Sequence, residues 1–332
     1  MRYRPHVRLF QCDPDIRLAR SEIYLDPAEP RRLGIISHGH SDHIGRHGHF
    51  VATAPTAAFI RIRQGDDLRG TELPYRTEHL LDGWTVSLHP AGHVLGSSMI
   101  RVQCAEGSLL YTGDFRLAPS YTAEPAEVPE ADAVIMESTY GSPEWVFPSR
   151  ESLREQLLAL VQDIAARGKT AVLLAYSLGK AQEVAAMLRD SPVRVVMHST
   201  VARISEVYEK HGVDLGKYEI WTRQASLFGH RSTMDLRSAA VIVPPHMTNE
   251  LRRIPRRETV ALTGWALHGS RDTDHALPLS DHADFHELLD FAEQARAKTI
   301  FVTHGSKRFA EELRRRGMGA EFLRGKPQMK LF

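Results

Sequence analysis

Three histidines and an aspartate occupy six consecutive positions directly after a short apolar stretch, and this cluster constrains the fold more than any other feature. The residues are His38, His40, Asp42 and His43, in the segment IISHGHSDHIG. In an extended segment, residues two apart point to the same side, and the last histidine follows where the chain turns. Imidazole and carboxylate groups suit zinc and similar divalent ions. Four such groups exceed the three protein ligands of one open catalytic zinc, so they favour two adjacent ions.

Three further candidate ligands stand at the ends of other predicted strands. His93, Asp114 and His304 lie in the segments HPAGHVLG, LLYTGDF and TIFVTHGS, each next to or near a glycine. A rigid strand would hold such a side chain while the following loop opens to a cleft. Each residue alone would more often be structural. Together with the first cluster they predict a metal centre rather than a solvent-exposed, histidine-rich loop.

Composition sets the broad class of protein. A chain of 332 residues corresponds to about two domains, at roughly 150 residues for each. The balance of 42% hydrophobic and 25% charged residues is typical of a soluble globular protein with a core. The net charge of +1 disfavours a protein that coats long polyanions, although it permits a local basic cleft. Cys12 and Cys104 are the only cysteines, which excludes a disulfide framework and a cysteine-rich zinc module.

The pattern of apolar residues predicts location and organisation. The first residues lack the apolar core of a signal peptide, and no apolar run reaches the ~18 residues of a membrane span. We therefore expect a cytoplasmic protein without membrane contact. The first third of the chain indicates strands and turns, such as those over 84–92 and 97–114. From 149 onward, helices and apolar strands alternate, beginning with a helix over 149–169, and this is typical of a parallel α/β sheet.

The segment SHGHSDH, followed in order by GH, GD and THG, resembles the metallo-β-lactamase superfamily over nearly the whole chain. The resemblance implies an α/β fold, an αββα sandwich of two sheets flanked by helices, with two metals along one edge. It favours zinc, with manganese as the alternative. It implies that Asp26 supports a metal-binding histidine from behind. The implied ligands are His38, His40 and His93 for the first metal, Asp42, His43 and His304 for the second, and Asp114 as the bridge.

An α/β insert before the last ligand resembles the β-CASP branch of this superfamily, which processes nucleic acids. The motifs IMESTYG (135–141), LLAYSLGKAQEV (173–184) and PLSDHADF (278–285) carry the resemblance. It implies a metallo-β-lactamase domain over 1–142 and 258–332, with a β-CASP cap over 143–257. The motif LTGWA before LSDHADF, together with the short length, is most like bacterial DNA-ligase-associated exonucleases.

This resemblance implies a metal-dependent nuclease, a hydrolase of phosphodiester bonds. The favoured function is a DNA exonuclease that processes DNA ends, in which a DNA ligase or helicase could be the partner. The first alternative is an RNase of the same branch that acts in RNA processing or decay. A second alternative is a catalytically silent, partner-binding subunit. It is disfavoured because such subunits usually lose ligands, whereas all seven candidates are present here.

The resemblance also implies a catalytic pair, with Asp42 counted among the catalytic residues. His282 would donate a proton to the leaving oxygen, and Glu137 would keep the imidazole oriented and protonated. The structural alternatives are helix-capping roles for both residues. Candidate nucleic-acid contacts are Ser138 and Thr139 in the segment STYGS and Lys180 at the start of a helix, where the dipole favours phosphate.

Overall fold

A computed structural model describes residues 9–12, 14–221, 234–247, 251, 254–269 and 272–323. The chain divides into two compact units. Unit 1 comprises Met1–Val146 and Asp281–Leu331, and unit 2 comprises Phe147–Ser280. The two segments of unit 1 are joined in one sheet, because strand β18 (Thr299–Thr303) pairs in parallel with strand β11 (Ala133–Glu137).

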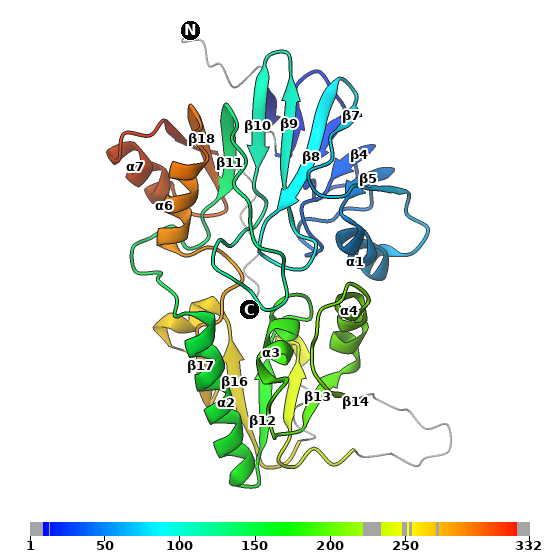
Figure 1. Cartoon of the computed structure of the whole chain (residues 1–332), viewed down its shortest axis with the longest axis vertical. Coiled ribbons are helices and arrows are strands. Elements are labelled where there is room, and N and C mark those ends of the chain that lie inside the picture. Colours follow the sequence, from blue (N-terminus) through cyan, green and yellow to red (C-terminus); the bar gives the residue numbers. More distant parts are fainter. Residues whose placement is uncertain are drawn as a thin grey trace. The chain divides into compact units, whose positions relative to one another are not determined.

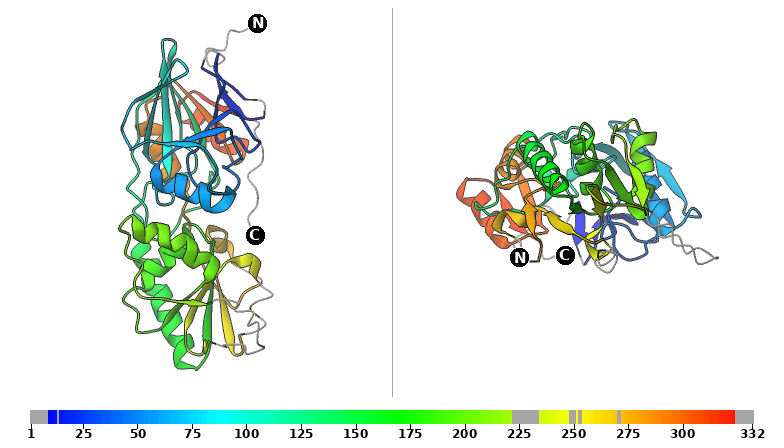
Figure 2. Two further views of the ribbon diagram at one scale, coloured as in Figure 1. Left: turned by 90° about the vertical axis from the view of Figure 1, so that its right-hand side faces the viewer. Right: turned by 90° about the horizontal axis from the view of Figure 1, so that it is seen from below.

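Unit 1 contains two sheets, visible as separate layers in the left view of Figure 2. The first sheet has the order β1–β2–β3–β4–β5–β6, in which β3 and β4 are parallel neighbours. Its strands are Phe10–Cys12, Ile16–Leu18, Ile23–Leu25, Leu33–Ile35, His49–Ala52 and Gly70–Glu72. The second sheet has the order β19–β18–β11–β10–β9–β8–β7 (Figure 1). Besides β11 and β18, its strands are β7 (His79–Leu81), β8 (Trp84–Pro90), β9 (Ser98–Cys104), β10 (Gly107–Tyr111) and β19 (Ala320–Phe322).

Apolar side chains explain why these layers stack. Alternate residues of each strand face one side, so each sheet can bury a face against a neighbour. Leu25 and Ile35 of the first sheet share a core with residues of the second, such as Ile100. Helix α1 (Ala54–Gln64) packs on the outer face of the first sheet. Helices α6 (Phe285–Gln294) and α7 (Lys307–Arg315) cover the second sheet. The predicted αββα sandwich is therefore confirmed.

The ends of several strands meet at one edge of the sandwich. Strands β10, β11 and β18 are parallel neighbours, so the residues after their carboxyl ends lie together. Asp26 follows β3, and residues 36–38 follow the parallel neighbour β4. The loop after β8 lies at the same edge. It connects Pro90 at the end of β8 with Ser98 at the start of β9, and these two residues are paired. Residues far apart in the sequence are thereby collected at one place.

Unit 2 is a parallel α/β structure, as the alternating pattern predicts. Its six-stranded sheet has the order β14–β13–β15–β12–β16–β17, with every neighbouring pair parallel. The strands are β12 (Thr170–Leu174), β13 (Val195–His198), β14 (Glu219–Trp221), β15 (Ala240–Val243), β16 (Arg257–Leu262) and β17 (His275–Leu277). The helices among the described residues of this unit are α2 (Arg150–Ala166), α3 (Lys180–Leu188) and α4 (Ser199–Lys210), with the short 3-10 turns η2 (Pro245–Met247) and η3 (Gly264–His268).

The division into units differs from the predicted domain boundaries. The sequence-based cap ends at 257, whereas the compact unit extends to Ser280. The reason is strand pairing: β16 pairs with β12, and β17 pairs with β16, so both belong to the sheet of unit 2. The other boundary lies at Val146, close to the predicted 142.

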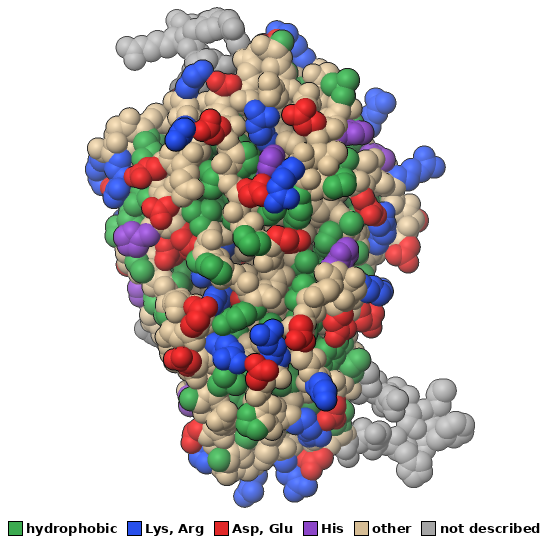
Figure 3. Space-filling model, viewed as in Figure 1, with side chains coloured by type: hydrophobic (Ala, Val, Ile, Leu, Met, Phe, Trp, Pro, Cys, Tyr) green, Lys and Arg blue, Asp and Glu red, His purple; other side chains and the backbone are tan. Residues whose placement is uncertain are grey.

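Two surface properties bear on function. Among the described residues, no helix combines the length and apolar character needed to cross a membrane. On the face shown in Figure 3, Lys and Arg side chains are interspersed with Asp and Glu side chains and do not gather in one large patch. This distribution agrees with the net charge of +1.

Candidate metal centre and active site

The first group of candidate ligands converges after strands β4, β8 and β10. Ligand atoms of His38, His40, His93 and Asp114 all lie within 4.8 Å of one another. His40 Nδ1 is 3.1 Å from both His38 Nε2 and His93 Nε2. With Zn–N bonds of about 2.0–2.1 Å, tetrahedral geometry places neighbouring ligand nitrogens roughly 3.3 Å apart. The spacing of these nitrogens therefore suits one cation between them.

The partners of the outer nitrogens define where the ring protons lie. His93 Nδ1 is 2.8 Å from the carbonyl oxygen of Asp281. A carbonyl oxygen only accepts hydrogen bonds, so Nδ1 carries the proton and Nε2 presents its lone pair to the group. Burial also lowers the pKa of His93 below its ordinary value, which favours the neutral ring.

The second group shares Asp114 with the first. Ligand atoms of His43, Asp114 and His304 lie within 4.8 Å of one another. The carboxylate is 3.4 Å from His43 Nε2 through Oδ2, and 3.6 Å from His304 Nδ1 through Oδ1. Asp26 Oδ2 accepts a hydrogen bond of 2.8 Å from His43 Nδ1. Asp26 thus orients the His43 ring through the nitrogen that does not face Asp114.

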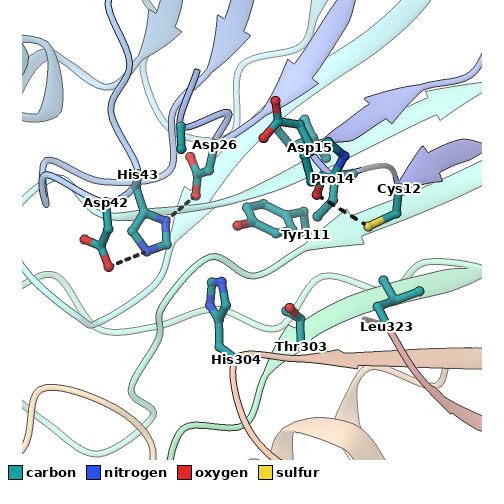
Figure 4. A pocket seen from close by; sticks show the side chains of 13 residues that line it. Cys12, Pro14, Asp15, Asp26, Asp42, His43, Tyr111, Thr303, His304 and Leu323 are labelled. Atoms are coloured by element: carbon teal, nitrogen blue, oxygen red, sulfur yellow. Dashed lines mark hydrogen bonds and ion pairs between the residues drawn. The ribbon is translucent and has the colours of Figure 1, made fainter. Parts of the chain in front are cut away.

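Asp42 lies at the margin of this second group. Its Oδ2 is 3.9 Å from His43 Nε2, but its carboxylate is not part of the compact trio formed by His43, Asp114 and His304. In Figure 4, His43 lies between Asp42 on one side and Asp26 on the other. The predicted set of seven ligands is therefore brought to one site, with Asp42 the outermost member.

Buried polar atoms without hydrogen-bond partners test whether cations fit. Within the described part of the chain, Asp114 Oδ1 and His304 Nδ1 have no hydrogen-bond partner. A buried polar atom that lacks a partner costs about 1–3 kcal/mol, and more if it is charged. Both atoms belong to the second group, where coordination of a cation would satisfy them. The donor set of imidazoles and one shared carboxylate accordingly fits two divalent cations.

The close approach of these imidazole and carboxylate groups shifts their pKa values. Although burial raises the pKa of Asp114, the rings of His43 and His282 outweigh it and hold the pKa well below its ordinary value. Burial opposes protonation of His43, but Asp114 and Asp26 raise its pKa well above 6.5. Burial comes first, and together with the neighbouring rings of His43 and His93 it holds the pKa of His38 well below 6.5. The carboxylate shared by both groups is thus the negative centre of the site.

His282 and Glu137 form a hydrogen-bonded pair beside the two groups. His282 Nδ1 is 3.0 Å from both carboxylate oxygens of Glu137, so this nitrogen carries a proton. Glu137 itself is fixed by the amide of Phe115 at 2.9 Å and the hydroxyl of Thr139 at 2.5 Å. His282 Nε2 lies 3.9 Å from Asp114 Oδ2 and therefore faces the shared carboxylate. Burial lowers the pKa of His282, but Glu137 and Asp114 raise it to about 9.

Backbone conformation at the site is unusual. Asp26 and His304 have positive φ values of 42° and 51°. Non-glycine residues seldom adopt this left-handed conformation, and it clusters at functional sites when the surrounding structure enforces it. Gly113, with φ of 56°, needs to be glycine for a second reason, because a Cβ there would lie 2.5 Å from Ser37 Oγ. Absence of that side chain lets the end of β10 approach β4.

A pocket opens against the second group. Its walls include Asp42, His43 and His304, together with Tyr111 and Asp26 (Figure 4). The remaining walls come from the first strands and from the end of the described chain, and are Cys12, Pro14, Asp15, Ile16, Leu25, Ala28, Thr303 and Leu323. The candidate metal centre thus borders a hollow within unit 1.

The three tentative nucleic-acid contacts have other partners. Ser138 is 1% exposed, and its hydroxyl donates to the carbonyl of Thr303 at 3.1 Å. The hydroxyl of Thr139 donates to Glu137. Lys180 is buried at the start of α3 in unit 2, with its ammonium 5.2 Å from the ring of Tyr176. Ser138 and Thr139 therefore support the strand ends and the His282–Glu137 pair, and Lys180 packs inside unit 2.

Sequence reasoning missed two residues of the site. Ser37 Oγ lies between Asp26 and the ring of His38, and the carbonyl of Asp281 orients His93. The position of Ser37, directly before the first ligand, is a signal that could have identified it. A backbone carbonyl has no such signal, because any residue type supplies one.

Comparison with known proteins agrees with this geometry. Residues 14–163 match the metallo-beta-lactamase superfamily, and residues 275–322 match the Zn-dependent metallo-hydrolase RNA specificity domain. A probable DNA ligase of Opitutus terrae is 37% identical over 306 residues, which cover 90% of this chain and 29% of that protein. An RNase J-like protein of Methanocaldococcus jannaschii is 28% identical over 209 residues, which cover 52% of this chain and 50% of that protein.

A solved structure shares the fold. A protein of unknown function from Enterococcus faecalis superposes with a TM-score of 0.61 at 16% identity, over 89% of this chain and 80% of that chain. This chain spans 29% and 50% of the lengths of the two curated relatives. The order of the ligand motifs, the αββα sandwich with its α/β unit and these similarities lead to one conclusion: the chain belongs to the β-CASP branch of the metallo-β-lactamase superfamily.

Proposed function

We propose that this protein is a two-cation phosphodiesterase that acts as an exonuclease on DNA ends. The observation that carries the proposal is the single carboxylate of Asp114 shared by two histidine groups, with the His282–Glu137 pair facing it. Nucleases commonly use two cations about 3.5–4 Å apart to clamp a phosphate. His38, His40 and His93 would hold one cation, and His43 and His304 the other, with Asp42 at the margin.

The chemistry of the surrounding residues fits phosphodiester hydrolysis. When bound, the cations supply Lewis acidity toward the phosphate and lower the pKa of water. His282 holds a proton at Nε2, because Glu137 accepts from the opposite nitrogen and stabilises the charged ring. This proton can be transferred to the oxygen that leaves when the P–O bond breaks. His93 keeps its orientation through the carbonyl of Asp281.

DNA is the favoured substrate because one relative, which aligns with this chain over 306 residues, is named a probable DNA ligase. That similarity extends over 90% of this chain, through both units. A nuclease that trims ends would supply termini that a ligase can join, so a DNA ligase is the partner that we propose. Zinc is the proposed cation, and manganese is the alternative because His and Asp ligands also suit it.

An RNase is the second candidate, supported by a different observation. Residues 275–322, which include His282 and His304, match the domain described as an RNA specificity domain. The RNase J-like relative covers 52% of this chain. Both candidates use the same cation site and the same proton donor, so only the substrate distinguishes them.

Digestion of matched oligonucleotides tests the proposal. The purified chain, loaded with zinc or manganese, is incubated with DNA and RNA of the same sequence, labelled at the 5′ or the 3′ end. We expect stepwise release of mononucleotides from DNA. Cleavage of RNA alone would replace the DNA proposal by the RNase candidate. No cleavage of either, by protein that retains two cations, would reject nuclease function.

A further inference from the structure

The hydroxyl of Ser37 joins the two candidate cation groups. Ser37 Oγ is 2.5 Å from Asp26 Oδ2 and 2.9 Å from Nδ1 of His38. The same Asp26 oxygen accepts from His43 Nδ1 at 2.8 Å. His38 belongs to the first group, and His43 belongs to the second. A continuous line of contacts therefore runs from one group to the other, behind the ligand nitrogens.

The directions of these hydrogen bonds follow from the chemistry of each atom. An ionised carboxylate only accepts, so the Ser37 hydroxyl donates its single proton to Asp26. If that proton pointed to His38 instead, two oxygens would face each other at 2.5 Å without a proton between them. The serine oxygen must then accept from His38 Nδ1, which places the ring proton there. His38 Nε2 then has a free lone pair, with which it would bind the first cation.

The backbone fixes Asp26 and Ser37 relative to each other. The amide of Ser37 donates to Asp26 Oδ1 at 2.7 Å, and the two residues follow the parallel neighbours β3 and β4. Ser37 is 1% exposed and His38 is fully buried, so water does not replace the hydroxyl as acceptor. The backbone of Gly113 packs closely against Ser37, because a Cβ on Gly113 would lie only 2.5 Å from Ser37 Oγ.

We propose that Ser37 is a positioning residue through which Asp26 sets the ring tautomer of a cation ligand in both groups, directly at His43 and by way of the serine hydroxyl at His38. This inference rests on the proposed two-cation function. Partners of metal-binding histidines typically contribute 10- to 100-fold to metal affinity. The hydroxyl should therefore affect the first cation far more than the second, because His43 contacts Asp26 without it.

The experiment compares Ser37→Ala with a matched control, Ser98→Ala. Ser98 is also a buried serine, and its hydroxyl donates to the backbone carbonyl of Ser37 at 3.2 Å without contacting a ligand ring. Zinc binding to the metal-free full chain is measured by titration calorimetry, with bound zinc counted after gel filtration. We expect Ser37→Ala to lose about 10- to 100-fold in affinity at one site and to retain the other. Ser98→Ala should match the unmodified chain.

The proposal would be overturned if Ser37→Ala bound zinc at each site with the same affinity as Ser98→Ala. A second measurement does not depend on the folding of any variant. Nitrogen-15 NMR of histidine rings in the unmodified, metal-free chain should show the proton of His38 on Nδ1, and a proton on Nε2 would overturn the inference. If the unmodified chain binds no cation, the proposed function fails, whereas the tautomer still decides the role of Ser37.

Discussion

At the scale of single residues, Asp114 is the side chain on which most of the site depends. Its Oδ2 lies 3.4 Å from His43 Nε2, 3.6 Å from His38 Nε2 and 3.9 Å from both His93 Nε2 and His282 Nε2. It is 3% exposed, and although burial raises its pKa, the rings of His43 and His282 hold the pKa well below the ordinary value. Its ligand atoms lie within 4.8 Å of the group of His38, His40 and His93 and also of the group of His43 and His304, so it is a member of both.

We therefore predict that Asp114→Ala abolishes binding of two cations and nearly all hydrolysis. Loss of Lewis-acid stabilisation worth several kcal/mol corresponds to about a thousandfold or more in rate. Bound metal is measured by mass spectrometry, and cleavage is measured on labelled oligonucleotides. A variant that still carries two cations and cleaves at the original rate would contradict the shared role of this carboxylate.

His282 is predicted to act on the leaving group and not on the cations. His282→Ala should retain both cations and slow the cleavage of oligonucleotides by about 10²–10⁴-fold, the usual contribution of a general acid. A substrate with a nitrophenolate leaving group needs no proton, so its cleavage should fall much less. The ratio of the two rate losses is the measurement. Equal losses on both substrates would exclude His282 as the proton donor.

Sequence patterns reveal ligand residues better than the residues that support them. His38, His40 and His43 were predictable because their spacing places several imidazoles at one strand end. The hydroxyls of Ser138 and Thr139 instead serve the carbonyl of Thr303 and the carboxylate of Glu137. Partners of this kind depend on how strands pair, and local spacing does not encode them.

At the scale of secondary-structure elements, periodicity predicts which segments form strands, but not always to which sheet a strand belongs. The strand β16 follows the apolar pattern of segment 257–262, yet the predicted boundary at 258 divides it from its own sheet. Its neighbour β12 lies more than 80 positions earlier, as in the pair Thr170 and Arg257. Long-range strand pairing therefore decides to which sheet β16 belongs. The apolar pattern of the strand cannot decide it, because the same pattern would suit a strand of either unit.

A group of charges ties these elements together in unit 2. Glu258 on β16 accepts hydrogen bonds from Arg167, from Lys169 at 2.6 Å and from His275 on β17 at 2.8 Å. Hydrogen bonds from Arg167, followed by those from Lys169 and His275, hold the pKa of Glu258 well below 4.5. Because the folded-state pKa is lowered, this stabilisation is fully present above the ordinary glutamate pKa and is lost as the pH falls below it.

We predict that Glu258→Gln destabilises unit 2 by about 1 kcal/mol at pH 7, allowing for solvent screening of the exposed Arg167 and Lys169. The difference from the unmodified chain should shrink as the pH falls below about 4.5. Amide hydrogen exchange along β12 and β16 measures it. The control is Glu219→Gln, whose exposed contact with Arg194 at 3.4 Å should contribute little. A difference that does not change with pH would contradict the role of the charge.

At the scale of the whole molecule, the candidate ligands come from both ends of the chain. They range from His38 to His304 and are held at one edge of unit 1 by pairing of the parallel strands β11 and β18. An unfolded chain has no such site, so cation binding and folding of unit 1 are linked. Within the described part of unit 2, no group of three His, Cys, Asp or Glu ligand atoms converges in the same way.

This asymmetry leads to a prediction about stability. A cation that binds only the folded state at 100 times its dissociation constant adds about 2.7 kcal/mol to the free energy of unfolding. Zinc should therefore slow amide hydrogen exchange in β4, β10, β11 and β18 of unit 1, and a chelator should reverse the effect. Exchange in β12 and β15 of unit 2 should respond less, because those strands carry no ligand.

The Asp114→Ala variant serves as the control and should show no response to zinc in either unit. Equal protection of both units by zinc in the unmodified chain would mean that the cations stabilise the molecule as one cooperative body, and not through the strand ends of the sandwich.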